Sequence, residues 1–328
     1  MNQYYVTGYM GQGAKRMLYD LNQMEYVKLI DDEIGSRLLR FVYYRVMNLL
    51  GSYEKHPKIK SLFYPFYTLY RLSYNQECGH TVIFFNSLFW LGYDEAFLKK
   101  LKKKHPQLKL ILYIVDPMSG FSTDRFGHLF PYFETIYCVN KKDCETYGFH
   151  YYPLVYSKIE SRQSDVSASS DLFYLGSGID RNDILHDIAL HCNQEHVKTD
   201  IRVMDEGKAA THYREITYYD HPIAYDENMN ALLGTNCMLE VMHEGFDNPT
   251  QRYTEAVAYN KKLLTNNSEI IHFPYYHPDY MKVFENISDI DPMWICKKED
   301  VNYQYNGDFS PVRMIEEIDK LEAEGSLC

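Results

Sequence analysis

The sequence lacks the features that place a chain in or across a membrane. No apolar run approaches the ~18 residues of a membrane-spanning helix, and no charged segment followed by an apolar one opens the chain as a secretory signal would. Cysteine is sparse, with seven scattered residues and no CxxC pair. That spacing argues against a disulfide framework and a cysteine zinc site, and it suits a reducing compartment. We therefore expect a cytoplasmic protein.

Several common signatures of function are also missing. There is no GxGxxG dinucleotide fingerprint and no GxSxG nucleophile elbow, and no Ser–His–Asp ordering stands out. The net charge of −11 and the lack of an RNA- or DNA-binding motif argue against nucleic acid as a partner. The 32 tyrosines are the main compositional excess, and composition alone gives them no function.

What the chain does have is length and an uneven distribution of charge. Its 328 residues suffice for two domains, and a hydrophobic content of 45% is ordinary for a protein with packed cores. Residues 1–155 carry 19 Lys and Arg against 14 Asp and Glu, whereas residues 156–328 carry 15 against 31. The basic half therefore suits an anionic surface such as the inner face of a membrane. A solvated helix face is the better explanation of the lysine run 99–104 taken alone.

Strand-like and helix-like segments alternate in the first half. We expect strands at 4–8, 26–30, 81–85, 108–115, 135–139 and 151–155, and helices at 14–22, 33–50, 59–74, 93–105 and 141–147. A tight loop at Gly11–Gly13 should follow the first strand. Apolar strands that alternate with helices indicate a parallel sheet.

A polar, serine-rich segment, residues 161–170, precedes a second half of the same pattern. There we expect strands at 172–175, 200–204, 216–219, 237–241 and 263–265, helices at 181–193, 225–233 and 311–323, and a helix that opens near Pro249. The predicted fold class is therefore α/β, with two Rossmann-like domains at 1–160 and 171–328, the linker 161–170, and a ligand cleft between the domains. We leave open whether the last helix packs back on the first domain.

Two segments of the second domain suit a phosphate and a sugar. In the first, Gly176, Ser177 and Gly178 form a loop between a strand and the helix that begins near Arg181. Glycine lets the backbone approach a phosphate, a helix N-terminus offers free N–H groups, and arginine adds a bidentate donor. Taken alone, this pattern is more often a plain turn.

The second segment follows the apolar strand 237–241. Its polar residues are Glu244, Gly245 and Asn248 in a short loop, and Gln251, Arg252 and Glu255 at the start of the helix. Because ligands bind at the carboxyl ends of parallel strands, an arginine and a carboxylate there suit the phosphates and hydroxyls of a nucleotide sugar. The alternative for Arg252 and Glu255 is an i,i+3 surface ion pair worth about 0.3 kcal/mol.

These segments resemble the bacterial GT-B glycosyltransferases of capsule and lipopolysaccharide synthesis. Leu172–Arg181 looks like the start of their donor domain, and Glu244–Phe246 with Arg252–Asn267 looks like the segment with which they bind the nucleotide sugar. Upstream, Leu112–Asp116 and Phe133–Gly148, with Pro153-Leu154, look like the end of their acceptor domain. The resemblance covers residues 80–275.

By that resemblance, Glu255 would hydrogen-bond the ribose of the nucleotide, and Arg181 and Arg252 would neutralise the leaving diphosphate in place of a metal ion. Ten residues separate Glu244 from Glu255, a wider spacing than in many members of the family, which leaves the role of Glu244 open. Asp116, at the end of a buried strand, is our candidate general base, although a cap before Pro117 is its more ordinary role. His128 is a rival base.

Metal signals are poor. Asp289-Ile290-Asp291 has the DxD form of metal-dependent glycosyltransferases, but no strand precedes it to present it to an ion. A second set, His186, His191, Cys192 and His196, would spread around a helix. We expect neither a metal nor a cofactor apart from the nucleotide-sugar co-substrate.

The expected function is transfer of a sugar from a nucleotide-sugar donor to a cell-surface or lipid-linked glycan. The enzyme would be cytoplasmic, with peripheral contact between its basic first domain and the inner face of the membrane. Two alternatives from other classes stay open, namely a non-catalytic GT-B-like binding or assembly protein and another nucleotide-sugar enzyme such as an epimerase. The missing dinucleotide fingerprint argues against the epimerase.

Overall fold

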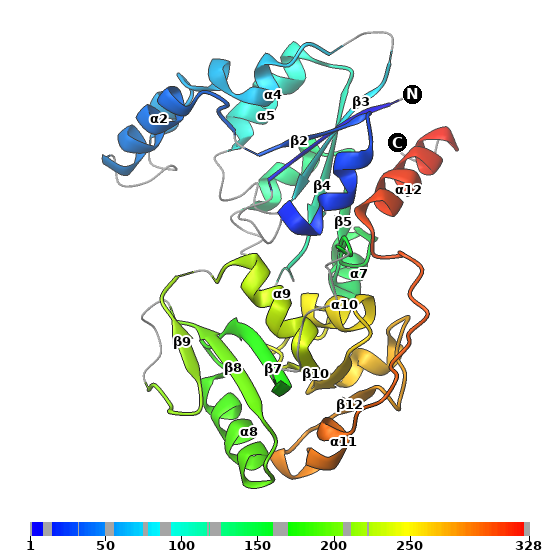
Figure 1. Ribbon diagram of the computed structural model, residues 1–328. Helices are drawn as coiled ribbons and strands as arrows, with labels where there is room; N and C mark the ends of the chain where they lie inside the picture. The colour runs from blue at the N-terminus through cyan, green and yellow to red at the C-terminus, as the bar shows by residue number, and fades with distance from the viewer. Residues whose placement is uncertain are drawn as a thin grey trace. The chain divides into compact units, whose positions relative to one another are not determined.

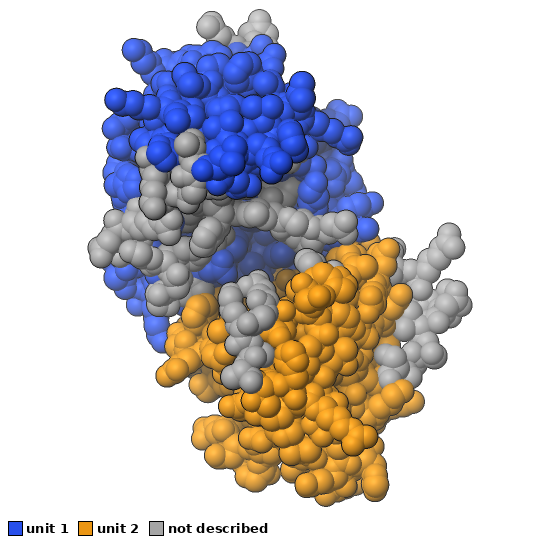
Figure 2. Space-filling model, turned by 90° about the vertical axis from the view of Figure 1, so that its left-hand side faces the viewer, with its two compact units in different colours: residues 1–157, 310–328 blue, residues 158–309 orange. Residues whose placement is uncertain are grey.

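The computed structural model describes residues 2–8, 15–31, 33–49, 56–74, 78–85, 93–116, 118, 126–159, 170–205, 211–221 and 223–324. The chain divides into two compact units, which Figure 2 distinguishes by colour. Unit 1 combines residues 1–157 with residues 310–328, and unit 2 is residues 158–309. Within the described ranges, no helix has the length and apolar character needed to cross a membrane.

Unit 1 is built on a six-stranded parallel sheet. Its strands are β1 (Gln3–Thr7), β2 (Val27–Ile30), β3 (His80–Phe85), β4 (Leu108–Ile114), β5 (Thr135–Cys138) and β6 (His150–Tyr151). Their order across the sheet is β2-β1-β3-β4-β5-β6. The central strand β3 is buried along its whole length, as expected for a parallel strand that helices cover on both faces. The predicted parallel sheet is confirmed.

The helices of unit 1 follow the predicted alternation (Figure 1). They are η1 (Tyr19–Gln23), α2 (Arg37–Leu49), α3 (Pro57–Lys60), η2 (Tyr64–Phe66), α4 (Thr68–Arg71), α5 (Glu95–Lys104), η5 (Gly127–Tyr132), α7 (Lys141–Tyr147) and α12 (Pro311–Ala323). Their ends carry ordinary signals. Asp94 caps α5 by accepting from the Phe97 N–H, and α7 ends at Gly148, whose φ of 71° favours glycine.

The helix α12 comes last in the chain but packs on the first strand of unit 1. The Tyr4 hydroxyl donates to Asp319 Oδ1 at 2.6 Å, and Asn2 Nδ2 lies 3.3 Å from the same oxygen. Met314, Ile315 and Ile318 are buried in the apolar cluster that also holds Tyr4 and Val6. The last helix therefore completes the core of unit 1.

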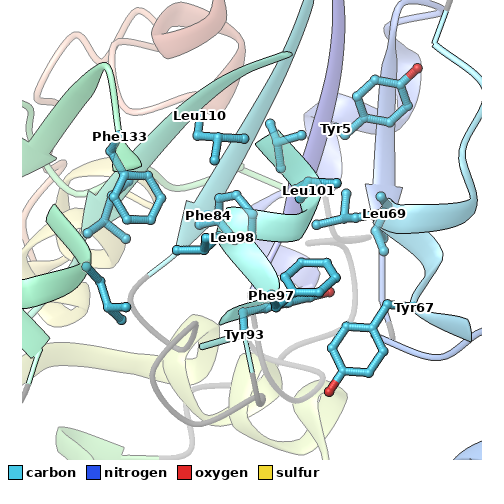
Figure 3. Close-up of a cluster of buried hydrophobic side chains, with 14 of the residues drawn as sticks. Tyr5, Tyr67, Leu69, Phe84, Tyr93, Phe97, Leu98, Leu101, Leu110 and Phe133 are labelled. Carbon is cyan, nitrogen blue, oxygen red and sulfur yellow. The ribbon is translucent and has the colours of Figure 1, made fainter. Parts of the chain in front are cut away.

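Aromatic side chains fill the other face of this sheet, as Figure 3 shows. Tyr67 and Phe97 have no exposed surface, and their ring centres lie 4.9 Å apart. The Tyr67 hydroxyl donates to the Tyr43 hydroxyl at 3.1 Å, and the Tyr64 hydroxyl bonds the carboxylate of Asp94. Because each of these buried hydroxyls has a partner, tyrosine serves here as a core residue.

Unit 2 contains a second six-stranded parallel sheet. Its elements are β7 (Ser170–Ser177), α8 (Asn182–Gln194), β8 (Thr199–Met204), β9 (Thr217–Tyr219), α9 (Tyr225–Gly234), β10 (Thr235–Glu240), α10 (Gln251–Ala258), β11 (Lys262–Thr265), η7 (Ser268–His272), β12 (Met281–Val283), η8 (Ile287–Asp289) and α11 (Pro292–Cys296). The strand order is β12-β11-β10-β7-β8-β9, which is the doubly wound order of a Rossmann fold.

Some elements differ from those predicted. The strand expected at 151–155 is limited to β6, because Pro153 has no N–H with which to continue the ladder. Of the helix expected at 14–22, residues 15–17 are helical and the 3-10 helix η1 follows from Tyr19. The short strand β12 and helix α11 were not predicted. Gly11, Gly13 and residues 161–169 of the predicted linker lie outside the described residues, and Ser170 is the first residue of β7.

Candidate functional site

The strand order of unit 2 identifies one point in its sheet where a ligand is expected. The chain passes from β7 to β8 and β9 on one side, then returns to β10, β11 and β12 on the other. In open parallel sheets, ligands bind outside the carboxyl ends of the strands at the point where the order reverses. Here that point lies between β7 and β10, and both segments singled out in the sequence follow one of these strands.

The glycine-containing segment after β7 is not the loop predicted from the sequence. Gly176 and Ser177 are the last two residues of β7, and only Gly178 lies in the turn. A Cβ on Gly176 would stand 2.5 Å from the Tyr174 hydroxyl, and one on Gly178 would stand 2.6 Å from Cγ1 of Val203. Neither glycine has a positive φ, so packing against these side chains explains both glycines.

Arg181 lies immediately before α8 and links the segment after β7 to the segment after β10, where the strand order reverses. Its Nη1 donates to the carbonyl oxygen of Val241 at 2.9 Å, and its guanidinium carbon lies 5.8 Å from the centre of the Tyr174 ring. Its Nε is buried and lies 3.8 Å from Asp180 Oδ1, but it has no partner within hydrogen-bond distance in the part of the chain that the structure describes. An anion beside this group would supply the missing acceptor.

The side chain of Arg252 crosses from α10 to β7. Its Nε donates to the Leu175 carbonyl oxygen at 3.1 Å, and its Nη1 pairs with Glu255 Oε2. The other oxygen of that carboxylate accepts from Gln251 Nε2 at 2.8 Å. Glu255 has no exposed surface, whereas the Arg252 side chain is 16% exposed. The i,i+3 pair of the alternative interpretation therefore exists, but it is buried, and the surface value of about 0.3 kcal/mol does not describe it.

Glu240, the last residue of β10, was missed by the sequence analysis. It is 2% exposed, and its carboxylate accepts from the hydroxyls of Thr250 and Thr265. Thr250 is the N-cap of α10 and accepts from the Arg252 N–H at 3.1 Å. Burial raises the pKa of Glu240, and the two hydroxyl donors offset part of that rise. Glu240 thus fixes the start of α10 against β10 and β11, and an acidic residue at the end of an apolar strand was the sequence signal for it.

A second missed pair links the segments after β7 and β10. Asp180 Oδ1 bonds His243 Nδ1, and Asp180 Oδ2 accepts from the Glu244 N–H at 3.3 Å. Burial by itself raises the pKa of Asp180, but the Glu244 N–H and His243 outweigh that effect, so the pKa lies below its usual value. The side chains of Asp180 and His243 are about one-third exposed, which leaves them accessible to a ligand.

The remaining predicted residues of this loop have less defined roles. Glu244 and Gly245 are exposed, and Gly245 has a φ of 78°, which a residue with a side chain rarely adopts. Asn248 Nδ2 lies 3.3 Å from the Pro249 carbonyl oxygen. Its Oδ1 is buried without a hydrogen-bond partner among the described residues, so this amide has an unused acceptor.

The candidate general bases belong to unit 1. Asp116 follows the end of β4 and is exposed, and His128 lies in η5 and is also exposed. The role of Asp116 stays a prediction.

The two metal-like sequence motifs have structural roles. Asp289 Oδ2 accepts from the N–H groups of Glu285 and Asn286, and Asp291 caps α11. His191 bonds the Ile290 carbonyl oxygen at 3.1 Å. No group of three or more His, Cys, Asp or Glu side chains could hold a metal ion in the ranges that the structure describes.

Comparison with known proteins finds the fold but no close relative. No protein-family model matches the chain, and no curated protein matches it either. Among solved structures, the α,α-trehalose-phosphate synthase (UDP-forming) of Burkholderia vietnamiensis matches with a TM-score of 0.55 at 10% identity, over 99% of both chains. A structure of trehalose-6-phosphate synthase, studied for glycosyltransfer with retention, matches with a TM-score of 0.50 at 10% identity, over 88% of both chains. This likeness confirms the predicted fold class, two Rossmann-like domains of GT-B type.

Proposed function

We propose that this chain is a glycosyltransferase that moves a sugar from a nucleotide-sugar donor to a cell-surface or lipid-linked glycan, without a metal ion. The observation that carries the proposal is the position of Arg181 and Arg252, whose guanidinium groups bond the backbone at the two strands where the order of unit 2 reverses. Two oriented guanidinium groups suit a diphosphate, which each can bond through two N–H groups.

The chemistry of sugar transfer explains the need for fixed cations. The bond between the anomeric carbon and the diphosphate oxygen breaks as the acceptor oxygen bonds that carbon, and negative charge collects on the leaving diphosphate. Donors that are already oriented stabilise this charge without reorganising. Arg181 is held by the Val241 carbonyl and Arg252 by the Leu175 carbonyl and Glu255, so both meet this condition.

Glu255 has a second role in the proposal, contact with the ribose. In the structure both of its oxygens are bonded within the protein, one to Gln251 and one to Arg252. A ribose hydroxyl can replace the Gln251 amide as donor to Oε1, because Gln251 lies in the first turn of α10 and is only half-buried. The Arg252–Glu255 pair would remain intact in the bound state.

In this proposal the donor site comprises Gly178, Arg181, Asn248, Gln251, Arg252 and Glu255, with Gly176 and Ser177 at the end of β7 and Glu244 and Gly245 in the adjoining loop. Asp116 of unit 1 is the proposed base that takes the proton of the acceptor hydroxyl. The fold shared with the two synthases supports sugar transfer as the reaction class. The protein would work in the cytoplasm, with unit 1 facing the acceptor.

Release of nucleoside diphosphate from nucleotide sugars tests the proposal. UDP sugars come first, because the Burkholderia enzyme is a UDP-forming synthase. We expect turnover in the presence of EDTA for wild type, and at least a hundredfold loss for Arg252→Gln. Arg214→Gln, an exposed arginine of unit 2, is the matched control and should retain full activity. Nucleotide binding without any turnover would instead favour the non-catalytic binding protein, and turnover abolished by EDTA would refute the metal-independent mechanism.

A further inference from the structure

The helix α2 of unit 1 presents an apolar face to solvent. Leu38 is 73% exposed, Phe41 62%, Val42 40% and Leu49 84%. Positions 38, 41, 42 and 49 lie on one side of a helix, and Arg37 and Arg45 are exposed on the same side. We call these six residues the α2 outer face. It holds four of the exposed large apolar residues of the described chain on a single helix, which soluble surfaces rarely do.

The opposite side of α2 is firmly packed, so the exposed face is not the result of a loosely attached helix. Tyr43 and Met47 have no exposed surface. The Tyr43 ring lies 5.1 Å from that of Phe63 and 6.1 Å from that of Tyr67. The helix is thus anchored in the core of unit 1 by one side, and Figure 1 shows it at the periphery of that unit.

The charge on α2 is of one sign. Arg37, Arg40 and Arg45 are its charged residues, and it contains no acidic residue. The Arg45 guanidinium carbon lies 6.0 Å from the centre of the Phe41 ring, so cationic and apolar groups share the same surface. A helix with a basic and apolar exposed face is typical of binding to the interface of an anionic membrane.

The lysine run of α5 is the other basic segment of unit 1, and its lysines have partners within that unit. Lys99 pairs with Glu95 at 2.8 Å, Lys102 pairs with Glu134, and Lys104 donates to the Tyr70 carbonyl oxygen. These lysines are bonded to other groups of unit 1. Their contacts favour the interpretation of the lysine run 99–104 as a solvated helix face. We therefore infer that α2, and not α5, is the basic segment available to an anionic surface.

We propose that the α2 outer face docks unit 1 onto a membrane surface rich in anionic lipid. A second copy of the chain is a poorer occupant, because a twofold contact through this face would bring the arginines of the two copies together. On a membrane, Leu38 and Phe41 enter the interfacial region while Arg37 and Arg45 bond lipid phosphates. The inference does not depend on the proposed transferase activity, although it would bring a lipid-linked acceptor to unit 1.

Flotation of the full chain with vesicles tests the proposal. Vesicles of phosphatidylcholine alone are compared with vesicles that also contain phosphatidylglycerol. We expect flotation only with the anionic vesicles, and weaker flotation at high salt, because exposed charges are screened. Leu38→Ser with Phe41→Ser should weaken binding at least tenfold, and Arg37→Gln with Arg45→Gln roughly thirtyfold.

Met293→Ser provides the matched control, since Met293 is 83% exposed but belongs to the acidic unit 2. This variant should float like wild type, and all variants should keep the thermal stability of wild type because the changed side chains are exposed. Flotation of the Leu38→Ser, Phe41→Ser variant at wild-type strength would overturn the proposal. So would sedimentation showing a wild-type dimer that this variant converts to a monomer, because the face would then bind a second copy.

Discussion

Glu240 offers the sharpest test of how the candidate site is held. Its buried carboxylate accepts from the hydroxyls of Thr250 and Thr265, of which Thr265 has no exposed surface. Glu240→Ala would leave both hydroxyls without this acceptor and open a cavity at the start of α10. Buried unsatisfied groups cost about 1–3 kcal/mol each, so we expect a loss of about 3 kcal/mol in the free energy of unfolding of unit 2.

Glu240→Gln separates the hydrogen bonds from the charge. It preserves the shape and one acceptor oxygen, so we expect a loss of only about 1 kcal/mol at pH 5. Because the pKa of Glu240 is raised in the folded state, wild type binds more protons folded than unfolded above the ordinary carboxyl pKa. Its stability should therefore fall relative to that of Glu240→Gln as the pH rises through the raised pKa, and the gap between the two should narrow between pH 5 and pH 8.

Urea unfolding followed by tryptophan fluorescence measures these differences. The chain has two tryptophans, and a Trp90→Phe background leaves Trp294 of unit 2 as the single reporter. Trp294 Nε1 donates to the Asp279 carbonyl oxygen at 2.9 Å, so its emission should change when unit 2 unfolds. Glu269→Gln, at an exposed position, is the control and should change stability by less than about 0.5 kcal/mol. A gap that stays constant from pH 5 to pH 8, or an alanine variant as stable as the glutamine variant, would refute the reasoning.

Three further predictions concern the same unit. Gly178→Ala should cost about 1–3 kcal/mol in urea unfolding, because its Cβ would stand 2.6 Å from Val203 Cγ1, and the same change should cost less in a Val203→Ala background, where Cγ1 is absent. Lys262→Met should cost about 2–4 kcal/mol, since the buried ammonium donates to three carbonyl oxygens at the end of α11, and Trp294 fluorescence would report the change. Asp180→Asn should weaken the His243 contact with little effect on stability at pH 7. Because the pKa of Asp180 is lowered, its contribution exists above the ordinary carboxyl pKa of about 4 and disappears as the pH falls through the lowered value. Wild type should therefore be slightly more stable than the variant at pH 7, and an acid titration of stability should show this difference vanish as the pH falls below about 4.

The fold could be predicted because its strands are apolar and its helices are amphipathic. Strands such as β3 and β4 are buried almost throughout, and runs of this kind separated by helical segments have few arrangements other than a parallel sheet. The strand β12 was missed because its three residues, Met281–Val283, are too few to show a period. Pro153 shortened β6 in a way that its missing N–H makes predictable.

Only part of the candidate site could be predicted from the sequence. The positions of Arg252 and Glu255 followed from helix spacing, but the carbonyl that holds Arg252 belongs to Leu175, 77 residues away, and no local pattern reveals such a partner. Gly176 and Gly178 were interpreted as a phosphate-binding loop, whereas Gly176 lies in β7 against Tyr174 of the same strand, and the contact of Gly178 with Val203 of β8 depends on tertiary packing.

The central claim is that unit 2 binds a nucleoside diphosphate beside Arg181, between β7 and β10. Thermal unfolding of wild type with UDP, GDP, CDP, CMP and dTDP, with and without EDTA, tests it most directly. One nucleotide at a hundred times its dissociation constant should add about 2.7 kcal/mol of stability to wild type and to Arg214→Gln, with EDTA present or not. Arg181→Gln and Glu255→Ala should lose most of that gain. Equal stabilisation of Arg181→Gln and wild type, or no stabilisation by any of the five nucleotides, would contradict the claim.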